Sequence, residues 1–499
     1  MSNPPVLIVG AGPTGLNLAL RLARHGTPFR LIDEREEAAS ESRALAVHAR
    51  TLEFYDQLGL ADAIVAAGTE VEGIHVHGGG RERVQLDIKK IGEGLSPYPF
   101  ILDFPQDEHE HFLVERLRES AIEVERGTAL LALHQTDDRV EVTLEGSKGR
   151  EDASFSYVCG CDGARSKVRE DLGIGFGGGT YEHLYYVADV RLEEADTERH
   201  LHVATGVDTF ALRLPARKGK MERLVGLVPD SVEQPRFDDV RASAESLLGT
   251  KVAELNWFST YRVHHRVADT FRKGRAFLLG DAGHLHSPVG GQGMNTGIGD
   301  AVNLSWKLAH VLGGRAPPDL LDTYEPERIA FARSLVKTTD RLFRMIVSGG
   351  LAGRFFRTTM LPTMAPIATR FIAGRRAFFR FASQIRISYP QSILSEGAAG
   401  GVASGDRLPW VQSADNFAPL KSLDWQLHIY GHADRQIVDT ADALSLPMHV
   451  FPWSQEANAA GLARDAAYLV RPDGHVALTT LEPTPERLKE YCSKHRLVF

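Results

Sequence analysis

The most constraining feature of the sequence is a glycine-rich turn that directly follows a short apolar run near the N-terminus. Residues 6–9, Val-Leu-Ile-Val, have the length and composition of a buried parallel strand. The turn at residues 10–15 comes next, and residues 16–25 form a helical pattern that ends at Gly26. A second apolar run at residues 29–32 completes a β-α-β unit. Such a unit predicts an α/β fold with a doubly wound, mainly parallel sheet.

The turn reads Gly10-Ala11-Gly12-Pro13-Thr14-Gly15, and its three glycines each have a physical reason. They allow a sharp turn, close approach of a pyrophosphate to the backbone, and tight packing of helix on strand, while the helix N-terminus offers free N–H groups to the phosphates. Asp33, at the end of the second strand, can accept hydrogen bonds from an adenosine ribose. This unit predicts a dinucleotide site, but NAD and FAD share the same ADP half and both stay open.

A second segment, Cys159-Gly160-Cys161-Asp162-Gly163, follows an apolar run and precedes a helical pattern from Lys167. We interpret Asp162 and Gly163 as a second loop that contacts the dinucleotide. A redox or metal role for the two cysteines is the alternative, but no further ligands lie nearby, so small apolar filler is favoured. With Cys492 the cysteines number three, which argues against disulfides and fits a reducing, cytoplasmic location.

The third segment runs from Gly280 to Asn295 and is again rich in glycine. Asp281 follows a buried-strand pattern at residues 276–279, where a carboxylate can hold a ribityl or ribose hydroxyl. A helix beginning near Met294 would aim its positive end at a flat ring lying on the loop, which suits a reduced flavin. The pair His284 and His286 has no carboxylate or thiolate partner at ligand spacing, so no metal site is predicted.

The rest of the chain predicts further layers around this dinucleotide-binding domain, which takes residues 1–70, 103–175 and 270–340. Residues 71–102 and 176–269 are rich in short alternating segments, typical of an inserted antiparallel β domain that would hold substrate. Residues 341–399 form a helical connection. Residues 400–499 read as a small α/β domain with a hairpin around Arg471-Pro472-Asp473-Gly474 and a closing helix at residues 485–494.

Charge and hydropathy exclude some functions. The net charge of −8 does not favour nucleic acid, and no apolar run is long enough for stable membrane insertion, since residues 345–372 are interrupted by arginines and prolines. Between residues 341 and 395 there are nine arginines and no acidic residue. A basic surface for a membrane or an acidic partner is one interpretation, and packing helices whose arginines pair with acids elsewhere is the favoured one.

The three segments, in this order, resemble the single-component (class A) FAD-dependent aromatic hydroxylases. The sequence GIGDAVNLSWKLA at residues 297–309 is most similar to the phenol hydroxylase and polyketide hydroxylase branch. The resemblance implies FAD as cofactor in a glutathione-reductase-like domain. It implies FAD contacts at these positions: Gly10, Gly12, Gly15, Asp33, Arg43, Gln106, Asp162, Gly163, Asp281, Pro288, Gly293, Met294 and Asn295.

The resemblance also implies a reaction. NAD(P)H reduces FAD, the reduced flavin adds O2 to form a C4a-hydroperoxide, and one oxygen atom passes to a small aromatic substrate, either phenolic or polycyclic. His48 and Pro288 are the candidate catalytic residues. The acid that this branch carries near the flavin would align with Leu45, so the base is not identified. Residues 400–499 resemble an appended thioredoxin-like domain, in which the lone Cys492 implies a packing or homodimer role rather than thiol exchange.

Three alternatives stay beside this reading. A related flavin-dependent epoxidase, reductase or halogenase is one, although none of the five tryptophans stands in a Trp-x-Trp-x-Ile-Pro motif. An antibiotic-modifying monooxygenase is another. The third belongs to a different class, a protein that binds a membrane or a partner through its arginine-rich segment.

Overall fold

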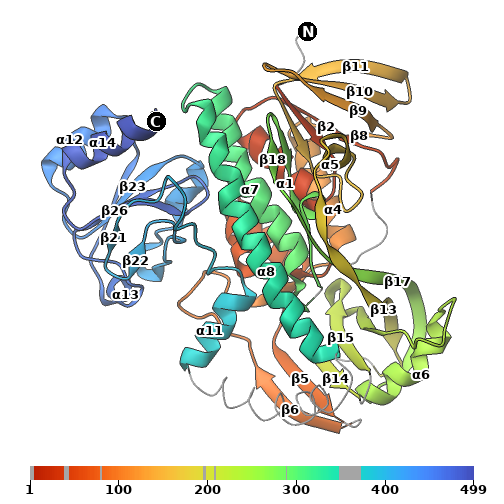
Figure 1. Cartoon of the computed structure of the whole chain (residues 1–499). Helices are drawn as coiled ribbons and strands as arrows, with labels where there is room; N and C mark the ends of the chain where they lie inside the picture. The colour runs from red at the N-terminus through yellow and green to blue at the C-terminus, as the bar shows by residue number, and fades with distance from the viewer. Residues whose placement is uncertain are drawn as a thin grey trace.

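This computed structural model describes residues 5–38, 44–78, 81–194, 198–206, 209–287, 289–347 and 372–499. Figure 1 shows the helices α7 (Gln292–Leu312) and α8 (Tyr324–Val347) running through the middle of the molecule. The C-terminal region lies on one side of them, and the sheets formed by the earlier part of the chain lie on the other. Within the described residues, no helix combines the length and apolar character needed to cross a membrane.

A six-stranded sheet forms the core of the N-terminal part, in the order β18-β19-β12-β1-β2-β8. Strand β1 lies at its centre and pairs in parallel with β2 and β12. All four residues of β1 are buried because layers cover both faces of the sheet, which explains its continuous apolar sequence. The strands are β1 (Val6–Val9), β2 (Phe29–Asp33), β8 (Glu125–Arg126), β12 (Tyr157–Gly160), β18 (Arg272–Lys273) and β19 (Ala276–Leu278). The predicted β-α-β opening and its parallel sheet are confirmed.

Helix α1 (Pro13–Arg24) begins earlier than the expected residue 16, because proline at the first helical position has a suitable φ and needs no N–H partner. It packs against α7, which begins two residues before Met294 as expected. The other helices of this part are α2 (Ala49–Asp56), α3 (Ala61–Ala67), α4 (Gln106–Glu119) and α5 (Lys167–Asp171). Two small antiparallel sheets complete it: β3 (Ala46–Val47) with β7 (Ile101–Asp103) and β4 (Thr69–Val71), and β9 (Ala129–Gln135) with β10 (Val140–Gly146) and β11 (Gly149–Phe155).

An eight-stranded sheet follows the order β20-β17-β13-β16-β15-β14-β5-β6. Its pairs are antiparallel, as expected, except for β14 and β5, which run in parallel. Helix α6 (Phe237–Leu248) covers one face through an apolar cluster that includes Ala204 and Ala211. The strands are β5 (Gly73–Gly78), β6 (Arg81–Asp87), β13 (Phe176–Leu192), β14 (His200–Thr205), β15 (Phe210–Ala216), β16 (Met221–Leu227), β17 (Val252–Ala268) and β20 (His284–Leu285).

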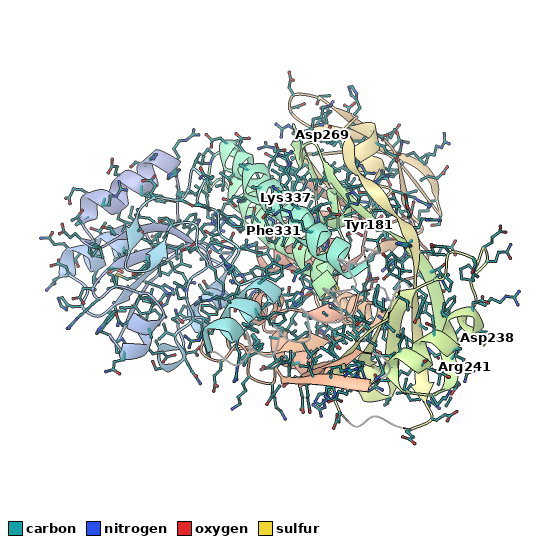
Figure 2. All side chains as sticks on the ribbon, turned by 60° about the horizontal axis from the view of Figure 1, so that its bottom comes forward. Tyr181, Asp238, Arg241, Asp269, Phe331 and Lys337 are labelled. Atoms are coloured by element: carbon teal, nitrogen blue, oxygen red, sulfur yellow. The ribbon has the colours of Figure 1, made fainter. Side chains whose placement is uncertain are left out.

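Helix α8 connects this sheet to the core. Figure 2 shows Tyr181, on β13, close to the α8 residue Lys337, while Asp238 and Arg241 mark α6 at the far edge of the sheet. The hydroxyl of Tyr181 donates a hydrogen bond to the carboxylate of Asp340, on the last part of α8. The eight-stranded sheet is therefore joined to α8 by a side-chain contact as well as by the chain itself.

The C-terminal region contains a four-stranded sheet in the order β24-β23-β25-β26. Strands β23 and β24 are parallel, and β25 is antiparallel to both β23 and β26. The elements are β23 (Gln426–Tyr430), α12 (Arg435–Ala443), β24 (Met448–Phe451), α13 (Gln455–Ala459), β25 (Ala467–Val470), β26 (Val476–Thr480) and α14 (Pro485–His495), preceded by α11 (Ile372–Ala382) and the short β21 (Ala398–Ala399) and β22 (Val402–Ala403). The predicted hairpin and closing helix are confirmed, while residues 348–371 of the arginine-rich segment lie outside the described residues.

A buried ionic cluster joins this region to α7 and α8. Glu327 accepts two hydrogen bonds from Arg471, at 2.8 and 2.9 Å, and one from Lys307, at 2.8 Å. The side chains of all three residues are fully buried. Removing charged groups from water is costly, so this cluster is stable only while every member keeps its partners. The C-terminal region is thus fixed to the helices that lead to the glycine-rich loops.

Candidate functional site

The N-terminal turn brings backbone into close contact at two of its three glycines. Gly10 has a φ of +100°, and a Cβ there would lie 2.4 Å from the carbonyl oxygen of Cys161. A Cβ on Gly15 would lie 1.9 Å from the carbonyl oxygen of Gly10. Gly12 differs, because beyond its chain neighbours no atom of the described residues lies within 4 Å of a Cβ built on it. The first two glycines are required by packing, whereas Gly12 opens its backbone to a ligand.

The N-terminus of α1 is left without a protein cap. Its N-cap residue is Gly12, no side chain accepts a hydrogen bond from the first turn, and that turn contains no acidic residue. Asp33 instead accepts a hydrogen bond from the backbone N–H of Ala11, at 2.7 Å, which holds the end of β2 against the turn. Within the described part of the chain the N–H groups of the first turn are thus uncapped, and together with the positive end of the helix dipole they favour an anion at this place.

The second loop lies beside this turn, since Cys161 contacts Gly10. The Oδ2 atom of Asp162 accepts a hydrogen bond from Val168 N at 3.0 Å, whereas its Oδ1 atom is buried without a hydrogen-bond partner among the described residues. Burial raises the pKa of Asp162. Gly163 has a φ of +74°, and the space beside it is open. Asp162 thus presents an unused acceptor next to open backbone.

The two neighbouring cysteines do not take part in this chemistry as thiolates. Cys159 and Cys161 are buried and form no disulfide. Burial raises the pKa of both thiols well above the ordinary range, so both are neutral at physiological pH. This agrees with their interpretation as apolar filler around the end of β12.

The third loop meets the first at a contact among Thr14, Gly280 and Gly297. Gly280 has a φ of +58°. A Cβ on Gly297 would lie 2.3 Å from the Thr14 hydroxyl oxygen and 3.1 Å from the Cα of Gly280. Because Thr14 and Gly297 lie near the beginnings of α1 and α7, the N-terminal ends of both helices converge here. Asp281 lies exposed on the adjoining turn.

Helix α7 has the same kind of beginning as α1. Its N-cap residue is Gly291, with a φ of +61°, and it has neither a side-chain cap nor an acidic residue in its first turn. Gly293 and Met294, in that first turn, are half-buried. The molecule therefore aims two uncapped helix N-termini at one region, which suits a ligand that carries negative charge in two separated parts.

A buried carboxylate that the sequence analysis did not select organises the third loop. Asp300, on α7, accepts hydrogen bonds from Gly280 N at 2.9 Å and from Arg328 Nε at 2.6 Å, and its Oδ2 lies 2.8 Å from His284 Nε2. These positive and polar neighbours lower the pKa of Asp300 although burial opposes them. An aspartate among small and apolar residues, at positions 297–302, was the available signal.

Asn295 and His48 join the third loop to the start of α2. The Asn295 amide accepts from His48 N at 2.9 Å and from Thr51 Oγ1 at 2.7 Å, and donates to Ala46 O at 2.8 Å and Gly291 O at 2.9 Å. Every position of this amide is used within the protein. The structure thus places Asn295 beneath the loop as an anchor.

Two imidazoles border the loop in neutral form. His48 is buried beside Gly290 and Gly291, and burial lowers its pKa to about 4 despite those backbone neighbours. Burial likewise lowers the pKa of His286 to about 4. The Nε2 atom of His286 has no hydrogen-bond partner within the described part of the chain, and a Cβ on Gly293 would lie 3.6 Å from it. Both rings are neutral near pH 7.

Asp103 is a further buried acid that sequence reasoning missed. It ends β7 and is 2% exposed, and neither carboxylate oxygen has a hydrogen-bond partner among the described residues. Burial raises its pKa to about 8, although Arg223 acts in the opposite direction. At neutral pH this carboxyl holds a proton, as an internal proton donor would.

The remaining predicted positions divide into two groups. Gln106 begins α4, where its side chain accepts from Ala44 N at 3.2 Å and donates to Glu110 at 2.8 Å, so it ties α4 to the segment before β3. Arg43 and Pro288 lie outside the described residues.

Comparison with known proteins agrees with this site. A family model described as "FAD binding domain" matches residues 3–339. A 6-methylpretetramide 4-monooxygenase from Streptomyces rimosus is 37% identical over 419 residues, covering 80% of this chain and 72% of the relative. A pentachlorophenol 4-monooxygenase from Sphingobium chlorophenolicum is 33% identical, covering 81% and 75%.

A solved structure extends the likeness to the whole chain. The anhydrotetracycline hydroxylase OxyS from Streptomyces rimosus superposes with a TM-score of 0.78 at 28% identity, and the match covers 99% of each chain. The resemblance inferred from the three glycine-rich segments is confirmed. The chain belongs to the FAD-binding-domain family and, within it, to the FAD-dependent aromatic and polyketide monooxygenases.

Proposed function

We propose that this chain uses NAD(P)H and O2 to hydroxylate a polycyclic phenolic substrate. The observation that carries the proposal is the convergence of two uncapped, glycine-initiated helices, α1 and α7, beside Thr14. A polycyclic substrate is favoured over a small phenol because two of the three relatives described above are named for polyketide substrates, and one of these matches the whole chain.

The proposed FAD contacts follow the open groups of the site. Gly12 and the first turn of α1 would hold the pyrophosphate, with Gly10 and Gly15 shaping the turn, and Asp33 would bind the ribose. Asp162 and Gly163 would contact the dinucleotide through the unused oxygen and open backbone described above. Asp281 would bind the ribityl chain, with Gly293 and Met294 beside the ring. Arg43, Gln106 and Pro288 stay predictions from the family resemblance.

When bound, FAD supplies the redox chemistry through which O2 becomes able to oxygenate an aromatic ring. The protein's part is to exclude water, orient the substrate and manage protons. We assign proton management to His48, because its buried neutral imidazole can accept a hydrogen bond from a substrate hydroxyl beside Gly290 and Gly291. Asn295 would position His48 through its hydrogen bond to the His48 backbone.

The finer architecture is also proposed. Residues 1–70, 103–175 and 270–340 would form a glutathione-reductase-like domain, and residues 71–102 and 176–269 the substrate domain. Residues 341–399 would connect these to a thioredoxin-like domain at 400–499. A parallel β-α-β pair followed by an antiparallel hairpin and a closing helix supports that last assignment. Burial raises the pKa of its Cys492 to about 11, which favours a packing or homodimer role over thiol exchange.

The test is substrate-stimulated oxidation of NADH or NADPH by the FAD-loaded protein. A panel should pair polycyclic phenols with small phenols, and products formed under 18O2 should be identified by mass spectrometry. We expect stimulation and incorporation of one labelled oxygen atom, strongest with the polycyclic compounds. Oxidation of NAD(P)H that yields only hydrogen peroxide with every compound would contradict the proposed hydroxylation, and a preference for small phenols would contradict the substrate class alone.

A further inference from the structure

Four histidines gather on one face of the eight-stranded sheet, away from the glycine-rich loops in the sequence. Strands β5 and β14 pair in parallel, with His75 opposite His202 and His77 opposite Ala204. His200 and His202 alternate on β14 as His75 and His77 do on β5, so all four side chains share a face. The rings of His75 and His200 stack with centroids 4.5 Å apart.

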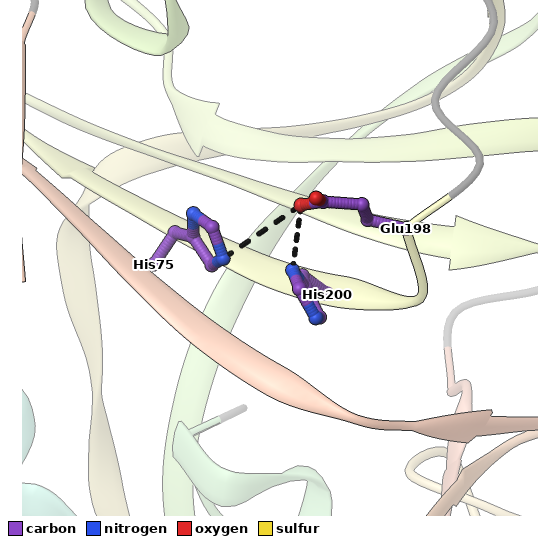
Figure 3. A group of neighbouring side chains, drawn as sticks. All are labelled: His75, Glu198 and His200. Atoms are coloured by element: carbon purple, nitrogen blue, oxygen red, sulfur yellow. Dashed lines mark ion pairs between the residues drawn. The ribbon is translucent and has the colours of Figure 1, made fainter. Parts of the chain in front are cut away.

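Two of these histidines and one glutamate bring ligand atoms together. The Nδ1 atom of His200 lies 2.9 Å from Glu198 Oε2, and the Nε2 atom of His75 lies 3.9 Å from the same oxygen. Figure 3 shows both rings directed at this carboxylate. One ligand atom from each residue lies within 4.8 Å of the other two. Bonds of about 2.0 Å to a tetrahedral ion require separations of roughly 3.3 Å, so small side-chain rotations suffice.

The His75 ring is prepared in the way that metal-binding imidazoles are. Its Nδ1 atom lies 2.8 Å from Glu82 Oε2, which fixes the ring and leaves Nε2 for another partner. That Nε2 atom is buried and makes no hydrogen bond with any described residue, although His75 is only 5% exposed. A carboxylate that holds the far nitrogen of a ligating histidine is the usual second layer of a zinc site. A buried nitrogen without a partner is costly, and a bound cation would satisfy it.

The remaining two histidines already have partners. His77 Nε2 lies 3.0 Å from His202 Nδ1, and the other nitrogen of His202 bonds to Arg213. They therefore lie beside the three-residue group with contacts of their own, and the fourth ligand of a tetrahedral ion would be water. Two nitrogens, one carboxylate and water form a donor set suited to Zn²⁺ and unsuited to Mg²⁺ or Ca²⁺, which prefer oxygen ligands.

His75, Glu198 and His200 lie on the opposite face of the sheet from an apolar cluster that contacts α2. Ile74 and Leu201 alternate with the histidines and pack with Ala49, the first residue of α2, in one apolar cluster. Ala204, on the histidine face, packs under α6. A metal here would not touch the glycine-rich loops directly.

We propose that His75, Glu198 and His200 form a structural binding site for a divalent transition-metal ion of the zinc type. The ion would link β5, from the first hundred residues, to the beginning of β14, and so stabilise the parallel pair within an otherwise antiparallel sheet. The proposal departs from the expectation of no metal site. Sequence spacing gave no signal, because His75 lies more than a hundred residues from Glu198 and His200 and only strand pairing brings it to them.

The experiment measures bound zinc in untagged, FAD-loaded protein. After treatment with EDTA and dialysis against about 10 µM Zn²⁺, which lies well above the dissociation constants of structural zinc sites, we expect one zinc per chain by mass spectrometry of the metal. We expect the melting temperature to rise by about 2–4 °C with Zn²⁺ and not with Mg²⁺. His75→Ala/His200→Ala and, separately, Glu198→Gln should lose the bound zinc and the shift. His432→Ala removes an exposed histidine outside the cluster and should keep both.

Three other results would count against the proposed metal site. Zinc bound equally by the wild type and the double variant would mean adventitious binding at other histidines and would overturn the proposal, as would the absence of zinc from the wild type. Glu198→Gln keeps the proposal testable if the double variant fails to fold, because the Glu198 side chain is 58% exposed and its change is mild. An equal response to Mg²⁺ would contradict the assigned donor chemistry.

Discussion

Helices α1 and α7 of the N-terminal part begin differently from helices α12, α13 and α14 of the C-terminal region. Helices α12, α13 and α14 each have a side-chain cap, from Asp434, Ser454 and Thr484 respectively. Helices α1 and α7 begin at glycine and have none. A cap satisfies backbone N–H groups within the protein, whereas a glycine leaves them for a ligand. The absence of a side-chain cap alone does not mark a ligand site, because α2, α3 and α4 also lack one while α5 is capped by Ser166. What α1 and α7 share is a glycine at the N-cap, and the proposed cofactor site makes use of the N–H groups that follow it.

The buried ionic cluster should give the largest effect on stability, because it fixes the C-terminal region to helices α7 and α8. Glu327→Gln removes a carboxylate that pairs with the fully buried Lys307 and Arg471. Arg471 keeps its pair with Asp473 at 2.6 Å, whereas Lys307 loses the ion pair that it forms among the described residues. Leaving a buried charge uncompensated costs about 3–5 kcal/mol, so the free energy of unfolding should fall by that order. Urea denaturation measures the loss. FAD affinity of the folded variant should stay unchanged if the C-terminal region is structural.

Asp439→Asn is the matched control, because Asp439 pairs with Arg435 at 3.9 Å on an exposed helix surface. Such pairs contribute little, so the change should stay below about 0.5 kcal/mol. A Glu327→Gln protein as stable as this control would show that the cluster does not hold the two regions together.

Gly12→Asp converts an uncapped helix into a capped one and should have the next largest effect. The space beside Gly12 accepts the new side chain, so the apoprotein should fold and gain a few tenths of a kcal/mol from the cap. The carboxylate would occupy the N–H groups meant for pyrophosphate and repel it. We expect FAD affinity to fall about 100-fold, equivalent to about 2.7 kcal/mol, measured by fluorescence titration of the apoprotein.

Gly12→Ala distinguishes the steric effect of a side chain at position 12 on FAD binding from the effect of its charge. A methyl group adds no charge and no cap, so its FAD affinity should lie between those of the wild type and Gly12→Asp. If Gly12→Asp bound FAD as tightly as the wild type, α1 would not be the pyrophosphate site.

The structure also shows which features of the fold and the site could be predicted from the sequence alone. The β1-α1-β2 unit and the beginning of α7 were predictable because a turn, an apolar run and a helix start are encoded by neighbouring residues. Asp300 and Asp103 were not, since their importance comes from burial and from partners distant in the chain, such as Arg328. The parallel pairing of β14 with β5 was missed for the same reason. Alternation predicts a strand and does not identify its neighbour.

We expect acid to lower the free energy of unfolding through buried histidines in both the N-terminal part and the C-terminal region. Only the histidine of the N-terminal part should also affect the cofactor site. Burial lowers the pKa of His48 to about 4 and of His428 to about 3. Both are neutral when folded, while the unfolded chain binds a proton near pH 6.5. Their contribution to stability is therefore present above pH 6.5 and lost as pH falls toward 4. Each can add up to about 1.4 kcal/mol per pH unit to the decline.

His48→Asn and His428→Asn should each flatten the pH dependence of the unfolding free energy between pH 6.5 and 5, measured in urea. Only His48→Asn should also alter FAD or substrate affinity, because His48 lies beside Gly290 and Gly291 and His428 lies in the C-terminal sheet. Equal effects of both variants on FAD binding would contradict the separation of the two regions.

Apart from the controls, the smallest expected effect, a change in the free energy of unfolding, comes from removing the side-chain cap of α12, a helix that we expect FAD not to contact. Asp434 accepts a hydrogen bond from Gln436 N at 2.7 Å at the start of α12. Asp434→Ala should lower the free energy of unfolding by about 1 kcal/mol, and Asp434→Gly by only a few tenths, because glycine lets water reach the exposed N–H groups. Saturating FAD should stabilise both variants as much as it stabilises the wild type. A smaller gain on adding FAD to Asp434→Ala would mean that α12 takes part in cofactor binding, and the contrast between α12 and the glycine-initiated helices α1 and α7 would then not separate fold from function.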